Sequence, residues 1–247
     1  MILTSKNNPL IKETASLKEK KGRKTHGLFL VEGIKMSREI AKSGLETDRI
    51  FVTEQLADSI EFPTEKTVVV TQEVMRFLSD EKTPQGVVCR VKIPHNPLQK
   101  PQGSCLILDG VADPANIGAI IRTANAAGYE EVYLTTDCAD AYAPKSVRAS
   151  MSGIFFTKLY VGEREEILSV MQDVPVLIAD MGGQNVFSYT PPQSFALVIG
   201  NEANGVSSQM RQAATHTVKI PMRDTQESLN AAVSAGILMY QLKKQTF

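Results

Sequence analysis

Two short runs of the chain, residues 105–108 and 196–199, are apolar at every position. A strand with one face in water alternates polar and apolar side chains, whereas a strand covered on both faces is apolar throughout. The runs therefore favour a parallel sheet with helices on both faces. Strand and helix alternate along the chain, which predicts an α/β fold. The predicted strands lie at 104–109, 131–135, 155–161, 174–180, 195–200 and 217–221, and the helices at about 116–127, 144–151, 164–172 and 207–213.

A long final helix is predicted over about 228–243. Apolar residues recur along it at the spacing that places side chains on one helical face. We expect that face to pack against the core. Its members are Leu229, Val233, Ile237 and Tyr240.

A proline-rich stretch at 93–103 prevents a continuous helix or central strand. It predicts a leading domain at 1–95, a linker at 96–103 and a trailing domain at 104–247, both domains being of ordinary size. The leading domain also alternates strands and helices. Its strands are predicted at 28–32, 49–53, 67–71 and 86–92, and its helices at about 8–21, 34–42 and 72–79.

Composition excludes several classes of protein. No apolar run approaches the ~18 residues of a membrane span, and the first residues lack the apolar core of a signal peptide, so we expect a cytoplasmic protein. The cysteines Cys89, Cys105 and Cys138 are isolated and the three histidines lie far apart, which predicts neither disulfides nor a metal site. Cys89 and Cys105 sit in apolar runs and are predicted to be core residues.

Positive charge is concentrated near the beginning of the chain. Lysine plus arginine equals aspartate plus glutamate at 27 each, so total charge gives no indication of nucleic-acid binding. Residues 4–27, however, carry seven cations against two carboxylates, which leaves +5. Such a segment can hold phosphates even in a neutral protein, and a solvated helix face is the alternative interpretation. The cations are Lys6, Lys12, Lys18, Lys20, Lys21, Arg23 and Lys24.

Unusual polar residues follow three of the predicted strands, where open α/β sheets bind their ligands. The first cluster, LDGVADPANIGAIIRTANAAG at 108–128, carries Asn116 and Arg122 at the start of a helix. An exposed helix start attracts anions. The alternative interpretations are that Asn116 caps the helix and that Arg122 is an ordinary surface cation.

The second cluster, ALVIGNEANGVSSQM at 196–210, ends an apolar strand at Gly200 and continues with Asn201 and Glu202. Glycine in such a loop lets a ligand approach the backbone closely, although a plain strand–turn–helix connection has the same pattern. The third cluster, VKIPMRDTQESLNAAVSAGI at 218–237, places Ser228 and Asn230 before the last helix. Ser228 could simply cap that helix.

The three clusters, in this order, resemble the SpoU family of RNA ribose methyltransferases in the SPOUT superfamily. The matching stretches are DPANIGAIIRTANAAG, VIGNEANGVS and IPMRDTQESLNAAVSAGI, with KTPQGVVCRV and SVRASMSGIFF as connecting segments. The stretch FLVEGIKMSREI is similar to the family's N-terminal substrate-binding domain, which resembles a small RNA-binding ribosomal protein. The resemblance implies a trefoil knot in the trailing domain, a homodimer formed through that domain, and S-adenosylmethionine bound in the knot.

The resemblance also implies roles for individual residues. The reaction methylates a ribose 2′-hydroxyl, with 23S ribosomal RNA as the expected substrate and transfer RNA as the alternative. A general base is the role that the family suggests for Arg122. Because a guanidinium is effectively always protonated, we favour a phosphate clamp. The implied catalytic residues are Asn116, Arg122, Glu202, Ser228 and Asn230, and the implied cofactor-binding residues are Ile199, Gly200, Asn201, Ile220, Met222 and Leu229.

Two other classes of protein compete with this interpretation. A nucleotide-binding oxidoreductase shares the strand–loop–helix pattern, but no G-x-G-x-x-G follows any predicted strand. A catalytically silent RNA-binding relative would have the same fold. The retained residues argue against the loss of activity, and they are Asn116, Arg122, Glu202, Ser228 and Asn230.

Overall fold

The computed structural model describes residues 2–57 and 62–243, and the chain divides into two compact units. The first unit comprises residues 1–95 together with 140–155, and the second comprises 96–139 and 156–247. Both units are α/β in architecture, as predicted.

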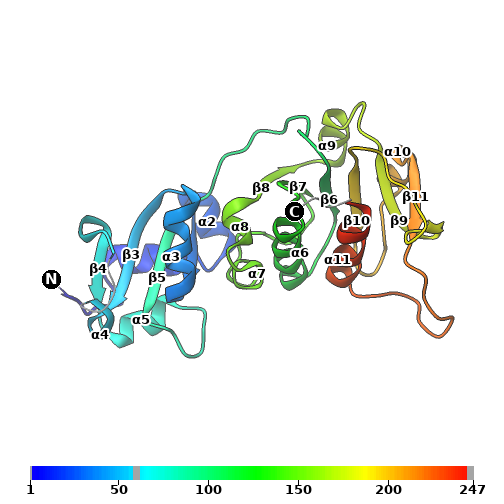
Figure 1. Ribbon diagram of the computed structural model, residues 1–247. Helices are drawn as coiled ribbons and strands as arrows, with labels where there is room; N and C mark the ends of the chain where they lie inside the picture. The colour runs from blue at the N-terminus through cyan, green and yellow to red at the C-terminus, as the bar shows by residue number, and fades with distance from the viewer. Residues whose placement is uncertain (1, 58–61, 244–247) are drawn as a thin grey trace. The chain divides into compact units, whose positions relative to one another are not determined.

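The first unit is built on a mixed five-stranded sheet in the order β1-β4-β3-β5-β2 (Figure 1). Strands β1, β4 and β3 run parallel, and β5 pairs antiparallel with both β3 and β2. The strands are β1 (Ile2–Leu3), β2 (Leu28–Glu32), β3 (Thr47–Thr53), β4 (Thr67–Val70) and β5 (Val87–Lys92). The helices are α1 (Pro9–Ser16), α2 (Lys20–His26), α3 (Ile34–Ser43), α4 (Glu54–Ala57), η1 (Thr64–Lys66) and α5 (Gln72–Leu78).

Apolar residues of α1 and α5 bury one face of this sheet, including Ile11 and Leu78 against Phe51. The predicted helix at 8–21 is in fact two helices, α1 and α2, because the chain turns at residues 17–19. Cys89 is buried in β5, as predicted.

Residues 140–155, far along the chain, complete the first unit. Their helix α7 (Pro144–Ser150) packs against β2, and the Tyr142 ring lies 4.9 Å from that of Phe29 between ring centroids. Arg23 donates two hydrogen bonds to Asp140, at 2.6 and 2.9 Å. Arg148 forms ion pairs with Asp80 and Glu81. The segment between the second unit's strands β7 (Glu131–Thr135) and β8 (Lys158–Gly162) is therefore held in place by buried and paired side chains of the first unit.

The second unit is built on a six-stranded parallel sheet in the order β11-β9-β10-β6-β7-β8. Besides β7 and β8, its strands are β6 (Cys105–Asp109), β9 (Val176–Asn185), β10 (Ala196–Gly200) and β11 (His216–Lys219). The helices are α6 (Pro114–Ala126), α9 (Arg164–Val170), α10 (Ser208–Ala213) and α11 (Ala231–Leu242). Helix α8 (Gly153–Phe156) belongs to the first unit except for its last residue. The predicted strand at 155–161 begins only at Lys158, because α8 occupies residues 153–156.

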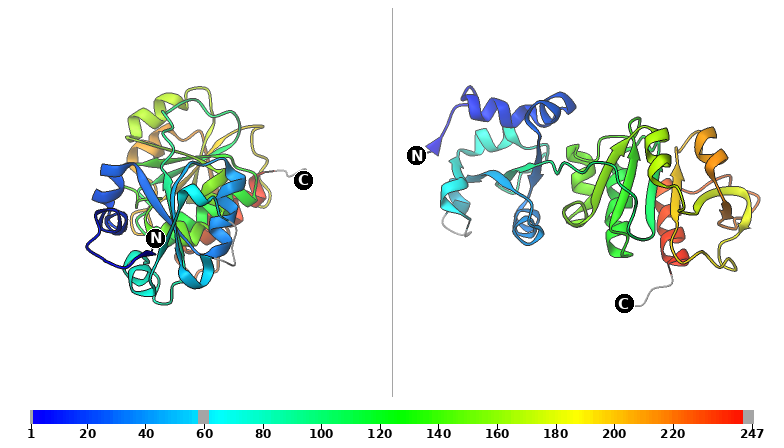
Figure 2. Two further views of the ribbon diagram at one scale, coloured as in Figure 1. Left: turned by 90° about the vertical axis from the view of Figure 1, so that its left-hand side faces the viewer. Right: turned by 90° about the horizontal axis from the view of Figure 1, so that it is seen from above.

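Helices cover both faces of this sheet, as the apolar runs predict. Alternate residues of the central strands, such as Ile107 and Val198, pack with α9 and α10. Helices α6 and α11 lie beside each other on the other face (Figure 2, right). The knot that the family resemblance implies stays a prediction.

The predicted core face of the last helix is wrong. Val233 is 51% exposed and Tyr240 49% exposed, and Leu229 precedes the helix. Helix α11 is apolar around most of its circumference, so periodicity alone cannot decide which stripe packs inward. The buried residues are Ala231, Ala235, Leu238, Met239 and Leu242.

Candidate functional site

The middle of β9 and the carboxyl ends of β10 and β11 surround one cavity of about 460 Å³ in the second unit. Loops from the second and third sequence clusters form much of its wall. The predicted residues that line it are Ile199, Gly200, Asn201, Glu202, Ile220, Met222, Ser228 and Leu229. The chain between β11 and α11 is an open loop without helix or strand (Figure 1, orange).

A tight hairpin follows β10 and leaves no room for a side chain at Gly200. The amides of Asn201 and Gly205 each donate to the other's carbonyl oxygen at 2.9 Å. A Cβ at position 200 would lie 2.4 Å from the Gly205 carbonyl carbon and from the Val206 nitrogen. Gly205 has φ +66°, a conformation that favours glycine. Both glycines are therefore required by the shape of the hairpin.

Asn201 ties this hairpin to the loop after β6. Its Nδ2 donates to the Gly110 carbonyl at 2.7 Å, and its Oδ1 accepts from the backbone amides of Ala203 and Asn204. With all three contacts made, the side chain is held in one orientation. The second cluster is thereby fixed to the first.

Glu202 joins the same two loops through its carboxylate. It accepts from the backbone amides of Ala112 at 3.0 Å and Asp113 at 3.3 Å, and from Asn116 Nδ2 at 2.8 Å. Burial raises the pKa of Glu202, but the hydrogen bonds from Asn116 and from backbone amides outweigh it, so the pKa lies below its ordinary value. Glu202 is therefore an anion at neutral pH.

Asn116 and Asn230, which do not line the cavity, extend this network. Asn230 caps α11, its Oδ1 accepting from the amides of Ala232 and Val233. Its Nδ2 therefore points away from the first turn of α11 and donates to Asn116 Oδ1 at 3.0 Å. Asn116 in turn donates to Glu202. One directed chain of hydrogen bonds thus links all three sequence clusters, and neither Asn116 nor Ser228 is a helix cap, because Asp113 caps α6 and Asn230 caps α11.

Arg122 stands apart from this network. It lies on α6 six residues after Asn116, is exposed, and does not line the cavity. Within the part of the chain that the structure describes, its guanidinium makes no hydrogen bond or ion pair. The structure therefore leaves Arg122 available to a ligand outside this cavity.

Sequence reasoning missed several residues of the site. Asp180 and Arg211 line the cavity and form an ion pair at 2.5 Å, and Lys219 and Glu227 line it as well. Asp109, whose carboxylate is buried, accepts from Arg164 Nε at 2.7 Å and from the Ser207 amide at 2.6 Å. Asp109 and Lys219 are the last residues of β6 and β11, so the strand-end rule could have found them, whereas Asp180 lies in the middle of β9.

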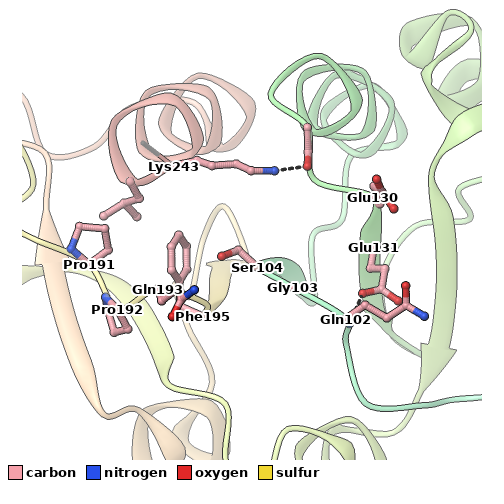
Figure 3. Close-up of a pocket in the computed structure, with 12 residues that line it drawn as sticks. Gln102, Gly103, Ser104, Glu130, Glu131, Pro191, Pro192, Gln193, Phe195 and Lys243 are labelled. Atoms are coloured by element: carbon pink, nitrogen blue, oxygen red, sulfur yellow. Dashed lines mark hydrogen bonds between the residues drawn. The ribbon is translucent and has the colours of Figure 1, made fainter. Parts of the chain in front are cut away.

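A second cavity, of about 720 Å³, opens at the amino ends of β6, β7 and β10 (Figure 3). Gln102, Glu131 and Phe195 line it, and Lys243 donates to the Gly128 carbonyl there. None of the predicted site residues lies in this cavity. The predicted cofactor-binding residues therefore line the other cavity, at the opposite edge of the sheet.

The basic residues predicted to bind RNA divide into two groups. Lys12, Lys20, Lys21 and Lys24 are exposed on α1 and α2. The others are engaged: Lys6 pairs with Glu73, Lys18 donates to the Phe77 carbonyl, and Arg23 is only 4% exposed. The Arg23 guanidinium is satisfied by Asp140 and by the carbonyls of Leu17 and Lys18. Arg23 is therefore a structural cation, which corrects its predicted place on an RNA-binding surface.

The described ranges, 2–57 and 62–243, hold neither a membrane-spanning helix nor a metal-binding cluster. No helix there is both long and apolar enough to cross a membrane. No group of three or more histidine, cysteine, aspartate and glutamate residues there could hold a metal ion.

The fold and the cavity define an α/β protein that binds a small ligand at the carboxyl edge of a parallel sheet, with a separate α/β unit before it. Residues 103–240 match the SpoU rRNA Methylase family, and residues 8–89 match the MRM3-like substrate binding domain. The first match covers more than half of the chain. The protein belongs to the SpoU rRNA methylase family.

Relatives of known activity are similar over nearly their whole length. The 23S rRNA (guanosine(2553)-2′-O)-methyltransferase RlmP of Bacillus subtilis is 29% identical over 98% of both chains. The 23S rRNA (uridine(2479)-2′-O)-methyltransferase of Streptomyces viridochromogenes is 28% identical, over 98% of this chain and 92% of the relative. The AdoMet-bound rRNA methyltransferase of Sinorhizobium meliloti superposes with a TM-score of 0.88 at 25% identity, over 98% of this chain and 96% of that one.

Proposed function

We propose that this protein transfers the methyl group of S-adenosylmethionine to a ribose 2′-hydroxyl of ribosomal RNA, most specifically of 23S rRNA. The observation that carries the proposal is the single cavity in which Gly200, Ile220 and Leu229 meet. These residues come from loops far apart in the sequence. The similarity of the whole chain to rRNA 2′-O-methyltransferases supports the same conclusion.

The cavity fits S-adenosylmethionine in size and charge. Its volume is within the range of about 300–1,000 Å³ that small ligands occupy. Three carboxylates and two cations line it, which leaves one negative charge for a cofactor whose sulfonium is positive; these residues are Asp180, Glu202, Glu227, Arg211 and Lys219. The residues that would hold the cofactor are Ile199, Gly200, Asn201, Ile220, Met222 and Leu229.

When bound, S-adenosylmethionine supplies an electrophilic methyl group that needs no metal. The residues of this chain must align the ribose hydroxyl and exclude water. Three hydrogen bonds and a pKa below its ordinary value make Glu202 a weak base, so it organises the loops, and the hydroxyl proton leaves to solvent water. Asn116 and Asn230 hold Glu202 in place. Ser228, exposed beside the cavity, is positioned to hydrogen-bond the incoming ribose.

Arg122 serves this reaction as a phosphate clamp. Its guanidinium is exposed on α6 and, among the described residues, unpaired. A guanidinium recognises phosphate through paired N–H donors and does not lose its proton at neutral pH. Contact with the phosphate next to the target ribose would orient the nucleotide without a proton transfer to Arg122.

The RNA backbone is gathered by the exposed lysines of α1 and α2. Changing Lys12, Lys20, Lys21 and Lys24 together to glutamine should weaken rRNA binding and flatten its salt dependence, because each lost phosphate contact removes about 0.7–0.9 from the log–log slope. Binding is measured by fluorescence anisotropy across a salt series. The control changes four other exposed lysines, Lys42, Lys82, Lys92 and Lys100. Equal losses of rRNA affinity in the two variants would show that net charge, and not the lysines of α1 and α2, determines RNA binding.

We also propose that the protein is a homodimer joined through α11. The exposed Val233 and Tyr240 share a stripe with the half-buried Ile237. Val233→Glu is expected to shift the mass measured by light scattering from twice 27.0 kDa to 27.0 kDa, because a dimer would bury the new charge. Val161→Glu, which changes an exposed valine on β8, should leave the dimer intact. A wild-type protein of 27.0 kDa in solution would refute the dimer.

The substrate is tested by mapping ribose methylation across all rRNA and tRNA in cells with and without this protein. We expect one 2′-O-methylation to disappear from 23S rRNA in the cytoplasm, where we place the enzyme. Loss from tRNA would replace the rRNA assignment by the tRNA alternative. No loss at all would favour a silent RNA-binding relative.

A further inference from the structure

An ion pair in the proposed cofactor cavity has no part in the network around Glu202. Asp180 and Arg211 both line this cavity, and Asp180 Oδ2 accepts from Arg211 Nη1 at 2.5 Å. Asp180 Oδ1 accepts from the Gly182 amide at 3.0 Å. These contacts hold the pKa of Asp180 below its ordinary value, so the carboxylate stays charged and fixed.

Arg211 is held in place on two sides. Its Nε donates to the Val206 carbonyl at 3.0 Å while Nη1 contacts Asp180. Its Nη2 lies beside the hairpin, 3.5 Å from where a Cβ on Gly205 would stand, and has no acceptor among the residues that the structure describes. The side chain is 43% exposed. The ion pair therefore presents one preorganised and unused guanidinium nitrogen at the cavity.

The unused Nη2 of this fixed guanidinium carries two N–H groups that can donate charge-assisted hydrogen bonds to a carboxylate. S-adenosylmethionine carries a carboxylate at its amino-acid end. Lys219 also lines the cavity, but its amine has no partner among the described residues to hold it in place. Ordering a flexible side chain on binding reduces the affinity gained. The geometry therefore favours Arg211 over Lys219.

We propose that Arg211 binds the α-carboxylate of the cofactor and that Asp180 is the positioning residue that holds Arg211 ready. The inference rests on the cofactor assignment of the proposed function and names the residues that recognise one end of that cofactor. It predicts that the protein distinguishes adenosyl compounds that carry the amino-acid end from those that lack it.

Two stable nucleosides test the assignment by isothermal titration, without any methyl transfer. S-adenosylhomocysteine carries the carboxylate, and 5′-methylthioadenosine lacks the whole amino-acid end. Arg211→Gln should weaken S-adenosylhomocysteine binding by about 10- to 100-fold, the range for a hydrogen bond to a charged group. It should leave 5′-methylthioadenosine affinity within about twofold, which also shows that the hairpin remains folded. Asp180→Asn should produce a smaller loss with the same selectivity.

Matched variants make each outcome decisive. Arg76→Gln, which changes an exposed arginine on α5, should leave both affinities unchanged. An equal loss of both nucleosides in Arg211→Gln would mean a structural role and would overturn the assignment. A larger selective loss in Lys219→Gln would overturn it as well. If the wild-type protein binds neither nucleoside, the cofactor assignment fails first and this inference fails with it.

Discussion

Gly200→Ala is expected to lower cofactor affinity at least about tenfold while the protein stays folded. The new Cβ would lie 2.4 Å from the Gly205 carbonyl carbon and the Val206 nitrogen, and both are backbone atoms that cannot rotate away. The hairpin of Asn201 and Gly205 must then move out of the cavity wall. Overpacking typically costs about 1–3 kcal/mol, so we expect S-adenosylhomocysteine affinity to fall by at least about tenfold in titration calorimetry.

The matched control for this variant is Gly103→Ala. Gly103 has no heavy atom within 4 Å of a Cβ built on it, so alanine fits there without contact. Its affinity should equal that of the wild type. If Gly200→Ala bound the nucleoside normally, the hairpin could not be the wall against which the cofactor rests.

Changing Glu202 is expected to have the largest effect on the rate of methyl transfer. Glutamine has the same shape, but it replaces one acceptor oxygen by an NH₂ donor that must face Ala112, Asp113 or Asn116, all of which donate. The loops after β6 and β10 then lose a hydrogen bond that joins them, or Asn116 loses its hydrogen bond to residue 202. Removing one preorganised group from an active site typically lowers turnover by about two to three orders of magnitude.

The measurement is single-turnover methyl transfer to rRNA with saturating cofactor. Glu202→Gln should be about 100-fold slower or more, with RNA affinity unchanged, because Glu202 is given no RNA contact and the lysines that gather the RNA backbone lie on α1 and α2 of the first unit. Glu130→Gln changes an exposed carboxylate at the opposite edge of the sheet and serves as the control. A normal rate in Glu202→Gln would show that the hydrogen bonds joining the three clusters do not matter for catalysis.

Much of this fold follows from local sequence. The apolar run at 105–108 predicts a strand that is covered on both faces. Gly200 at the end of an apolar strand predicts a turn. Both features are therefore predictable from the sequence. The convergence of loops at the carboxyl edge follows because parallel strands end at the same edge. Asn116, Glu202 and Asn230 could therefore be predicted as neighbours, although their hydrogen-bond order could not.

Other features depend on contacts between distant segments. Periodicity wrongly predicts the exposed stripe of α11 as its buried one, because apolar residues surround most of the helix and no single stripe stands out. Arg23 has the sequence context of a surface cation, and only the position of Asp140, 117 residues later, makes it a buried partner. The Asp180–Arg211 pair joins residues 31 apart on different elements. No local pattern encodes any of these pairings.

We infer that the protein uses this cavity to deliver a methyl group to a ribose oxygen of rRNA. The most direct measurement incubates the purified protein with isotope-labelled S-adenosylmethionine and unmodified 23S rRNA, followed by nuclease digestion and mass spectrometry of the nucleosides. We predict label in one 2′-O-methylated nucleoside with the wild-type protein, and almost none with Glu202→Gln. Label on a base, or equal ribose labelling by the two proteins, would contradict the account.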